Sequence, residues 1–152
     1  MKPFAPAIFV LLLSFTSFTT SAQKTVSAKQ AFFNAYPAVI NCNTGEIAKI
    51  FNTTENQAVS IPLSGNFSFT GTVTSSVIKY SNLQTVIIKS SLFDNAVFSI
   101  SKRTNPDNSI SYVGRILNQS YRDGYELKQT ASGNYKLIKI ETGNRIQDCS
   151  QP

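Results

Sequence analysis

The pattern of apolar and polar residues predicts a chain made mostly of β-strands. From Gln57 onward, apolar and polar residues alternate in short runs separated by turn residues, which is typical of antiparallel strands. Within residues 66–75, Phe67, Phe69 and Val73 alternate with serine and threonine, so one face is expected to be buried and the other solvated. Seven strands are predicted, over residues 57–63, 66–75, 83–90, 96–102, 109–119, 124–129 and 135–141.

The connections between these strands are short and rich in turn-forming residues. Asp123-Gly124 is the strongest short hairpin signal. Other predicted turns are Ser64-Gly65-Asn66, Phe93-Asp94-Asn95, Asn105-Pro106-Asp107-Asn108 and Ser132-Gly133-Asn134. Because no connection is long enough for a crossover helix, a single antiparallel sheet is expected rather than a parallel one. A twisted sheet of about seven strands curls into a partly closed barrel or folds into a sandwich.

Two helices are expected before the strands. The first is predicted over residues 27–36, with Ser27 as its N-cap and Pro37 at its end. Its apolar face would consist of Ala28, Ala31, Phe32 and Ala35. A second, shorter helix is predicted to begin at Thr44 and to carry Ile47, Ile50 and Phe51. We therefore expect a mainly β fold, with an α+β arrangement as the alternative, and the N-terminal helix packed on the sheet.

The start of the chain has the features of a secretory signal peptide. Lys2 is followed by an apolar run over residues 7–15 and by the small residues Thr20-Ser21-Ala22. We expect a signal peptide over residues 1–22, followed by one β-rich domain over residues 23–152. Because the apolar run is far shorter than the roughly 20 residues needed to cross a bilayer, no membrane span is predicted. The predicted location is secreted or periplasmic.

Export bears on the two cysteines of the chain. Cys42 and Cys149 lie near the two ends of the predicted domain. In an oxidising compartment such a pair is expected to form a structural disulfide. The sequence has no C-x-x-C motif, which a catalytic dithiol would use.

The charge balance indicates an acidic partner. The net charge of +6 falls to +5 when Lys2 is removed with the signal peptide. A net charge of this size favours acidic partners, with an acidic protein or a polysaccharide as the candidates, but it is also typical of secreted domains whose scattered charges form an ordinary solvated surface. The basic residues are scattered along the chain and match no nucleic-acid-binding motif, so nucleic acid is not expected as a partner.

The residues that usually carry catalysis predict no active site. The sequence contains no histidine, which excludes histidine-based triads and histidine-liganded zinc. Two Ser-x-x-Lys matches occur, at Ser76/Lys79 and Ser99/Lys102, but residues three apart on a strand point to opposite faces. No catalytic residue, metal ligand or cofactor is therefore assigned, and the protein is not expected to be an enzyme.

The candidate binding residues are tyrosines and arginines in the last three predicted strands and their turns. These are Tyr112, Arg115, Tyr121, Arg122 and Tyr125, with Tyr135 nearby. Both residue types are enriched at binding surfaces, although strands favour aromatic residues in any case. Alternation places Tyr112 and Arg115 on opposite faces unless a bulge at Gly114 redirects one of them.

The sequence thus favours a secreted or periplasmic, monomeric, non-enzymatic binding domain that is moderately basic and whose partner the sequence does not identify. Two alternatives stay open. One is a binder of a small apolar ligand inside the curled sheet, and the other is a hydrolase of unrecognised type.

Overall fold

The computed structural model of this protein describes residues 29–142. The predicted signal peptide lies outside that range, as does Cys149, the predicted disulfide partner of Cys42. Export and the disulfide therefore stay predictions.

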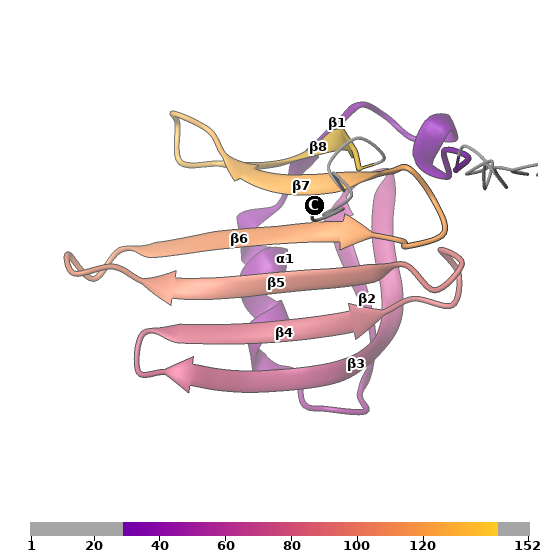
Figure 1. The fold of residues 1–152 in the computed structure, drawn as a ribbon. Helices are drawn as coiled ribbons and strands as arrows, with labels where there is room; N and C mark the ends of the chain where they lie inside the picture. The colour runs from indigo at the N-terminus through magenta and orange to yellow at the C-terminus, as the bar shows by residue number, and fades with distance from the viewer. Residues whose placement is uncertain (1–28, 143–152) are drawn as a thin grey trace, which may run out of the picture.

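Eight antiparallel strands form one sheet, in the order β1-β8-β7-β6-β5-β4-β3-β2 (Figure 1). The strands are β1 (Val39–Cys42), β2 (Ala58–Ser64), β3 (Phe67–Tyr80), β4 (Leu83–Lys89), β5 (Val97–Thr104), β6 (Ile110–Leu117), β7 (Asp123–Gln129) and β8 (Tyr135–Glu141). Strand β1 pairs with β8 and lies beside β2, where the backbone N–H of Asn43 donates to the carbonyl of Leu63 over 2.8 Å. The sheet is therefore nearly closed into a barrel, one of the two predicted shapes.

The seven predicted strands correspond to β2–β8. The bounds of β8 agree with the prediction, whereas β3 continues five residues beyond the predicted end, to Tyr80. Strand β1 was not predicted, because its four residues are too few to establish a periodicity.

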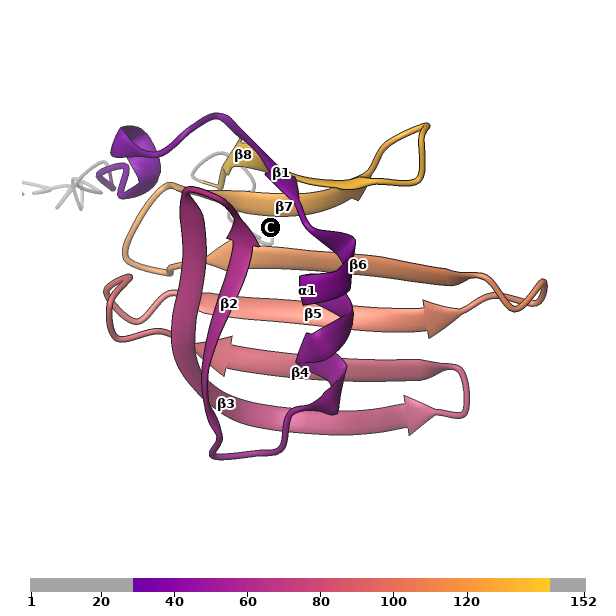
Figure 2. The same cartoon turned by 180° about the vertical axis from the view of Figure 1, so that it is seen from behind.

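The short helix predicted from Thr44 is confirmed as α1 (Thr44–Lys49), which continues into the 3-10 turn η2 (Ile50–Asn52). The side chain of Asn43 caps α1 by accepting a hydrogen bond from the N–H of Gly45 over 2.9 Å. Figure 2 shows α1 lying across the inside of the sheet. The residues that α1 and η2 bury against the sheet are Ile47, Ile50 and Phe51.

The helix predicted over residues 27–36 is wrong for the part that the structure describes. Only a 3-10 turn, η1 (Phe33–Ala35), forms there. The reason is a distant carboxylate: Asp123 accepts hydrogen bonds from the N–H groups of Phe32 and Phe33, over 2.7 and 2.8 Å. The carbonyl of Gln30 accepts from the N–H of Arg122 over 3.0 Å. These backbone groups therefore bond to β7 and the loop before it instead of to a helical turn.

Asp123-Gly124 does not form the predicted hairpin turn. Both residues belong to β7 and pair with Glu141 and Ile140, and residues 118–122 make the connection instead. Gly124 is needed for a different reason than a turn. A Cβ at this position would overlap the carbonyl oxygen of Ile116.

The inside of the sheet is filled by large apolar side chains. The rings of Phe69 and Phe93 stack with their centroids 5.3 Å apart, and Phe33 meets the ring of Tyr125 edge-on at 5.2 Å. Phe51, from η2, stacks on a ring of β6. The barrel interior is therefore a packed core.

Candidate functional site

The structure does not bring the five predicted binding residues onto one surface. The register between β5 and β6 runs without a bulge at Gly114, so Tyr112 and Arg115 face opposite sides. Tyr112 is 7% exposed and stacks on Phe51 at 5.6 Å. Tyr125 is 0% exposed, and its hydroxyl donates to the carbonyl of Pro37 over 2.6 Å. Both tyrosines belong to the core.

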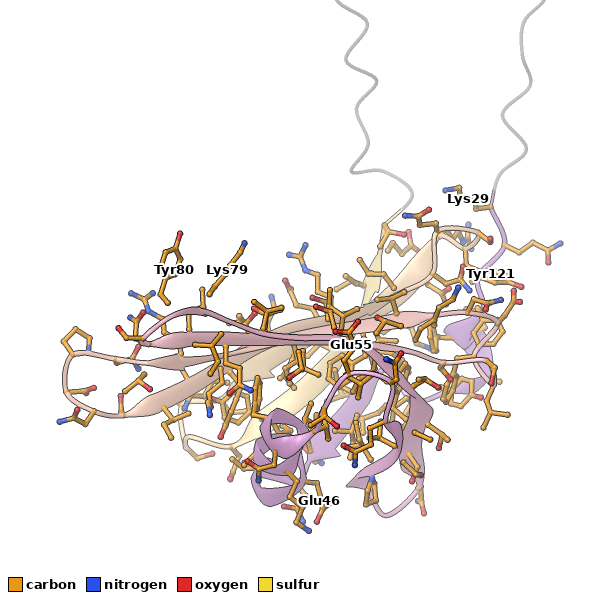
Figure 3. All side chains as sticks on the ribbon, turned by 90° about the horizontal axis from the view of Figure 1, so that it is seen from below. Lys29, Glu46, Glu55, Lys79, Tyr80 and Tyr121 are labelled. Carbon is orange, nitrogen blue, oxygen red and sulfur yellow. The ribbon has the colours of Figure 1, made fainter. Side chains whose placement is uncertain are left out.

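Tyr121 and Arg122 lie in the loop before β7. Figure 3 shows Tyr121 at one end of the barrel. The hydroxyl of Tyr121 donates to the carboxylate of Asp94 over 2.8 Å, and its ring packs against Phe32 at 5.0 Å. Arg122 is exposed. Of the five predicted residues, only Arg115 and Arg122 therefore present an exposed charged side chain.

The side of the sheet that faces away from the core is called the outer face here, and it consists of the outward residues of β3–β8. Residues that are paired across neighbouring strands share a face, so the register gives rows of side chains. One outward row is Ser75, Ile87, Ser99, Arg115, Glu126 and Ile138. The adjacent outward row includes Val77, Thr85, Ser101 and Val113. Between them runs a mostly buried row that contains Val86 and Ile100.

The outer face carries six basic side chains and one acidic one. The register places five of the cations there, and Figure 3 shows Lys79 and Tyr80 projecting from the side of the sheet opposite to Glu46. The six cations are Lys79, Lys89, Arg103, Arg115, Lys128 and Lys136, and the acid is Glu126. The other acidic residues of the described range lie in α1, in loops, in the core or at the end of β8: Glu46, Glu55, Asp94, Asp107, Asp123 and Glu141.

Two of these cations share the single carboxylate. Arg115 Nη2 lies 2.7 Å from Glu126 Oε1, and Lys128 Nζ lies 3.1 Å from Glu126 Oε2. The hydrogen bond from Arg115 and then the one from Lys128 hold the pKa of Glu126 below its ordinary value. The cluster keeps one net positive charge.

The sheet opens between β6 and β7 next to this cluster. Pairing of the two strands stops at Gly114 and Leu127, and Figure 1 shows them diverging toward the start of β6. The N–H of Tyr112, which precedes the paired segment, donates instead to the hydroxyl of Tyr135 on β8 over 3.0 Å. The buried N–H of Tyr112 therefore has a hydrogen-bond acceptor although it does not bond to β7.

A groove follows the outer face beside this opening. Its first part has a volume of about 700 Å³ and is lined by residues that include Ser99, Arg115 and Lys128. Its second part, of about 520 Å³, is lined by residues that include Tyr80 and Arg103. The two parts share Ser101, Ser111 and Val113, and together they are called the outer groove.

Sequence reasoning missed most of the residues of the outer groove. Ser99, Ser101 and Arg103 are spaced by two along β5, so the sequence pattern already indicates that the three side chains lie on the same face of the strand. Serine is common on the solvated face of a strand, so this spacing alone does not distinguish a binding groove from an ordinary surface.

The groups that line the outer groove are hydroxyls, basic side chains and a single carboxylate. Within residues 29–142, no three histidine, cysteine, aspartate or glutamate side chains cluster as metal ligands would. The one carboxylate in the groove, Glu126, is paired with two cations. Lys102 lies inside the barrel with its Nζ 5.3 Å from the centre of the Phe51 ring, whereas Ser99 points outward.

Cys42 is half-buried at the end of β1. Its Sγ lies 3.6 Å from the carbonyl oxygen of Ile40, and burial raises the pKa of the thiol to about 11. Because a thiolate is the reactive form, a reduced Cys42 would react slowly.

Comparison with known proteins gives no match: no family model, no curated protein and no solved structure matches this chain. Across the described part of the chain, no helix has both the length and the apolar character needed to cross a membrane.

Proposed function

We propose that this protein is a non-enzymatic binding domain that attracts an acidic partner to the outer face of its sheet. The observation that carries the proposal is the ratio of six basic side chains to one acidic side chain on that face. Charges of one sign gathered on one surface raise the local concentration of an oppositely charged partner and the rate of encounter. The predicted signal peptide places this activity in the periplasm or outside the cell.

The packing of the interior supports surface binding over the two alternatives. A small apolar ligand would need space inside the barrel, where stacked rings such as Phe69 and Phe93 fill the core. A hydrolase that uses two carboxylates would need a pair facing across a cleft, but the outer groove holds only Glu126.

The proposal is tested by measuring how salt and single charges affect association with an immobilised polyanion, using polyglutamate and hyaluronan as the probes. Binding is expected to weaken from low to physiological salt, because exposed charges are then screened over about 8 Å. Arg103→Gln and Lys128→Gln are each expected to slow association by about threefold, with a smaller effect on dissociation.

The matched control is Lys49→Gln. Lys49 is 70% exposed and lies in α1, on the inner side of the sheet, where it pairs with Glu46 at 2.6 Å. This variant removes the same charge away from the outer face and should leave association within about 1.5-fold of the wild type. Salt-independent binding, or an equal effect of all three variants, would show that the outer face does not attract the partner.

A further inference from the structure

We infer that the acidic partner is a linear polysaccharide with widely spaced acidic groups, bound along the outer groove. This inference rests on the proposed function and names the chemical class of the partner. Three features of the groove carry it: its course across the strands, the spacing of its cations and the side chains that line it.

The outer groove crosses several strands of the sheet. Its two parts, of about 700 and 520 Å³, meet at Ser101, Ser111 and Val113. The groove thus passes from Tyr80, at the end of β3, to Lys128 on β7 without leaving the outer face. An elongated polymer fits this course better than a compact ligand does.

The cations along the groove form two separate groups, Arg103 in one and Arg115 with Lys128, which share Glu126, in the other. Ser111 pairs with Arg103, and Arg115 lies four residues further along β6, so the two arginine Cα atoms are about 14 Å apart at ordinary strand dimensions. Duplex DNA carries one charge per roughly 1.7 Å of its axis, so this spacing suits a sparsely charged polymer and not a nucleic acid. A polysaccharide with one acidic group on every second sugar is such a polymer.

The lining of the groove combines hydroxyl groups with exposed apolar surface. Ser99, Ser101 and Ser111 present hydroxyls that can donate to and accept from sugar hydroxyls. Val113 and Tyr80 are 62% and 66% exposed, and they offer apolar contact to the C–H faces of a sugar ring. This lining offers hydrogen bonds and apolar contact side by side, which is what the hydroxyls and C–H faces of a sugar require.

The guanidinium of Arg115 is oriented by Glu126 and keeps further N–H donors for an acidic group of the ligand. Its Nε and Nη2 both donate to Glu126 Oε1, over 3.2 and 2.7 Å, which fixes the plane of the guanidinium. A guanidinium has five N–H donors, so the remaining ones are available to a carboxylate or sulfate of the ligand.

The experiment compares three soluble polymers at low salt by isothermal titration calorimetry. Hyaluronan carries a carboxylate on every second sugar, polyglutamate carries carboxylates on a peptide backbone, and dextran is a neutral polysaccharide. Hyaluronan is expected to bind most tightly at equal carboxylate concentration, and dextran is expected to bind weakly or undetectably.

The role of the groove hydroxyls is tested with a matched pair of variants. Ser101 bonds to Thr85 across β4 and β5 with 2.8 Å between their hydroxyl oxygens, and Ser60 bonds to Thr70 across β2 and β3 with 2.9 Å. Ser101→Val removes a hydroxyl from the groove, and Ser60→Val removes an equivalent one outside it. Ser101→Val is expected to weaken hyaluronan binding by about fivefold, whereas Ser60→Val leaves it unchanged. Ser111→Val gives a second groove variant if Ser101→Val does not fold.

Each outcome is decisive. Tighter binding of polyglutamate than of hyaluronan would overturn the inference and leave the proposed function standing. Equal effects of the groove variants and Ser60→Val would also overturn it, because the groove would then not contact the sugar. Failure of both polyanions to bind at low salt would overturn the proposed function as well.

Discussion

The inner and outer faces of the sheet are made by alternate residues of the same strands, and they differ in what they demand of those residues. On β5, Phe98 and Ile100 are completely buried, whereas their neighbour Ser99 is exposed and Ser101 is partly exposed. The inner residues must fill a core of fixed volume, so their size and shape are constrained. The outer residues have no such requirement and are free to carry charge and hydroxyl groups. Folding and binding therefore use different residues of one strand.

The polar groups of the two faces differ in the same way. On the inside, Asp123 bonds to Phe32 and Phe33, and every buried side-chain nitrogen or oxygen of the described residues has a hydrogen-bond partner. Such bonds hold the core together and leave little capacity for a ligand. On the outside, Arg115 and Lys128 converge on one carboxylate and keep donors for a partner.

The largest expected difference between the two faces is in the free energy of unfolding when adjacent inner and outer residues are replaced. Phe98→Ala should lower the free energy of unfolding by about 3–5 kcal/mol, because it removes a buried ring and leaves a cavity. Ser99→Ala, one residue further along the exposed face, should change it by less than about 0.5 kcal/mol. Urea unfolding followed by circular dichroism measures both. Similar losses in the two variants would mean that the faces do not differ in this way.

A smaller effect is expected from the buried hydroxyl of Tyr125 at alkaline pH. Burial raises the pKa of Tyr125 to about 12 in the folded protein. Its contribution to stability is therefore complete below the unfolded pKa of about 10 and is lost as the pH rises from there through 12.

Tyr125→Phe should remove this part of the alkaline loss, which is on the order of 1 kcal/mol at pH 11. It should also cost about 1 kcal/mol at pH 7, because the carbonyl of Pro37 loses its donor. The measurement is the free energy of unfolding at pH 7, 9 and 11. Tyr80→Phe, which removes an exposed hydroxyl on the outer face, is the control and should leave the free energy of unfolding at pH 7 unchanged. A Tyr125→Phe curve parallel to that of the wild type would contradict the prediction.

The smallest effect is expected from the exposed ion cluster at Glu126. Its lowered pKa means that the cluster stabilises the fold above the unfolded pKa of about 4.3, and that this contribution is lost as the pH falls through the folded pKa. Because the ions are exposed, the contribution should stay within about 0.5 kcal/mol. Arg115→Gln should raise the pKa of Glu126 more than Lys128→Gln does, as measured by NMR titration. An unchanged pKa in Arg115→Gln would mean that the ion pair does not form in solution.

The success of the strand predictions follows from a local cause. Alternation in β3 depends only on neighbouring residues, and it correctly assigned Phe67, Phe69 and Val73 to the buried face. The same rule separated Tyr112 from Arg115, which the absence of a bulge in β6 confirms.

The errors have a non-local cause. Residues 27–36 have a helical pattern, but the carboxylate of Asp123, about ninety residues away, binds the N–H groups of Phe32 and Phe33. Asp123-Gly124 has the composition of a turn, but the approach of the Ile116 carbonyl and the pairing with β8 place both residues in a strand. Local propensity was overridden in both places by tertiary contacts.

The sequence by itself determined seven of the eight strands, the alternation of residues along them and the excess of positive charge. Those properties depend on the period of two and on composition, and both are local. Only the tertiary structure decided which outward residues are neighbours, such as Arg115 and Glu126, because that depends on the register between strands. The tertiary structure also decided that β6 and β7 separate before Gly114, where the hydroxyl of Tyr135 accepts the hydrogen bond from the N–H of Tyr112 in place of a neighbouring strand. Register and strand separation arise from contacts between residues far apart in the chain, and the alternation within one strand carries no information about them.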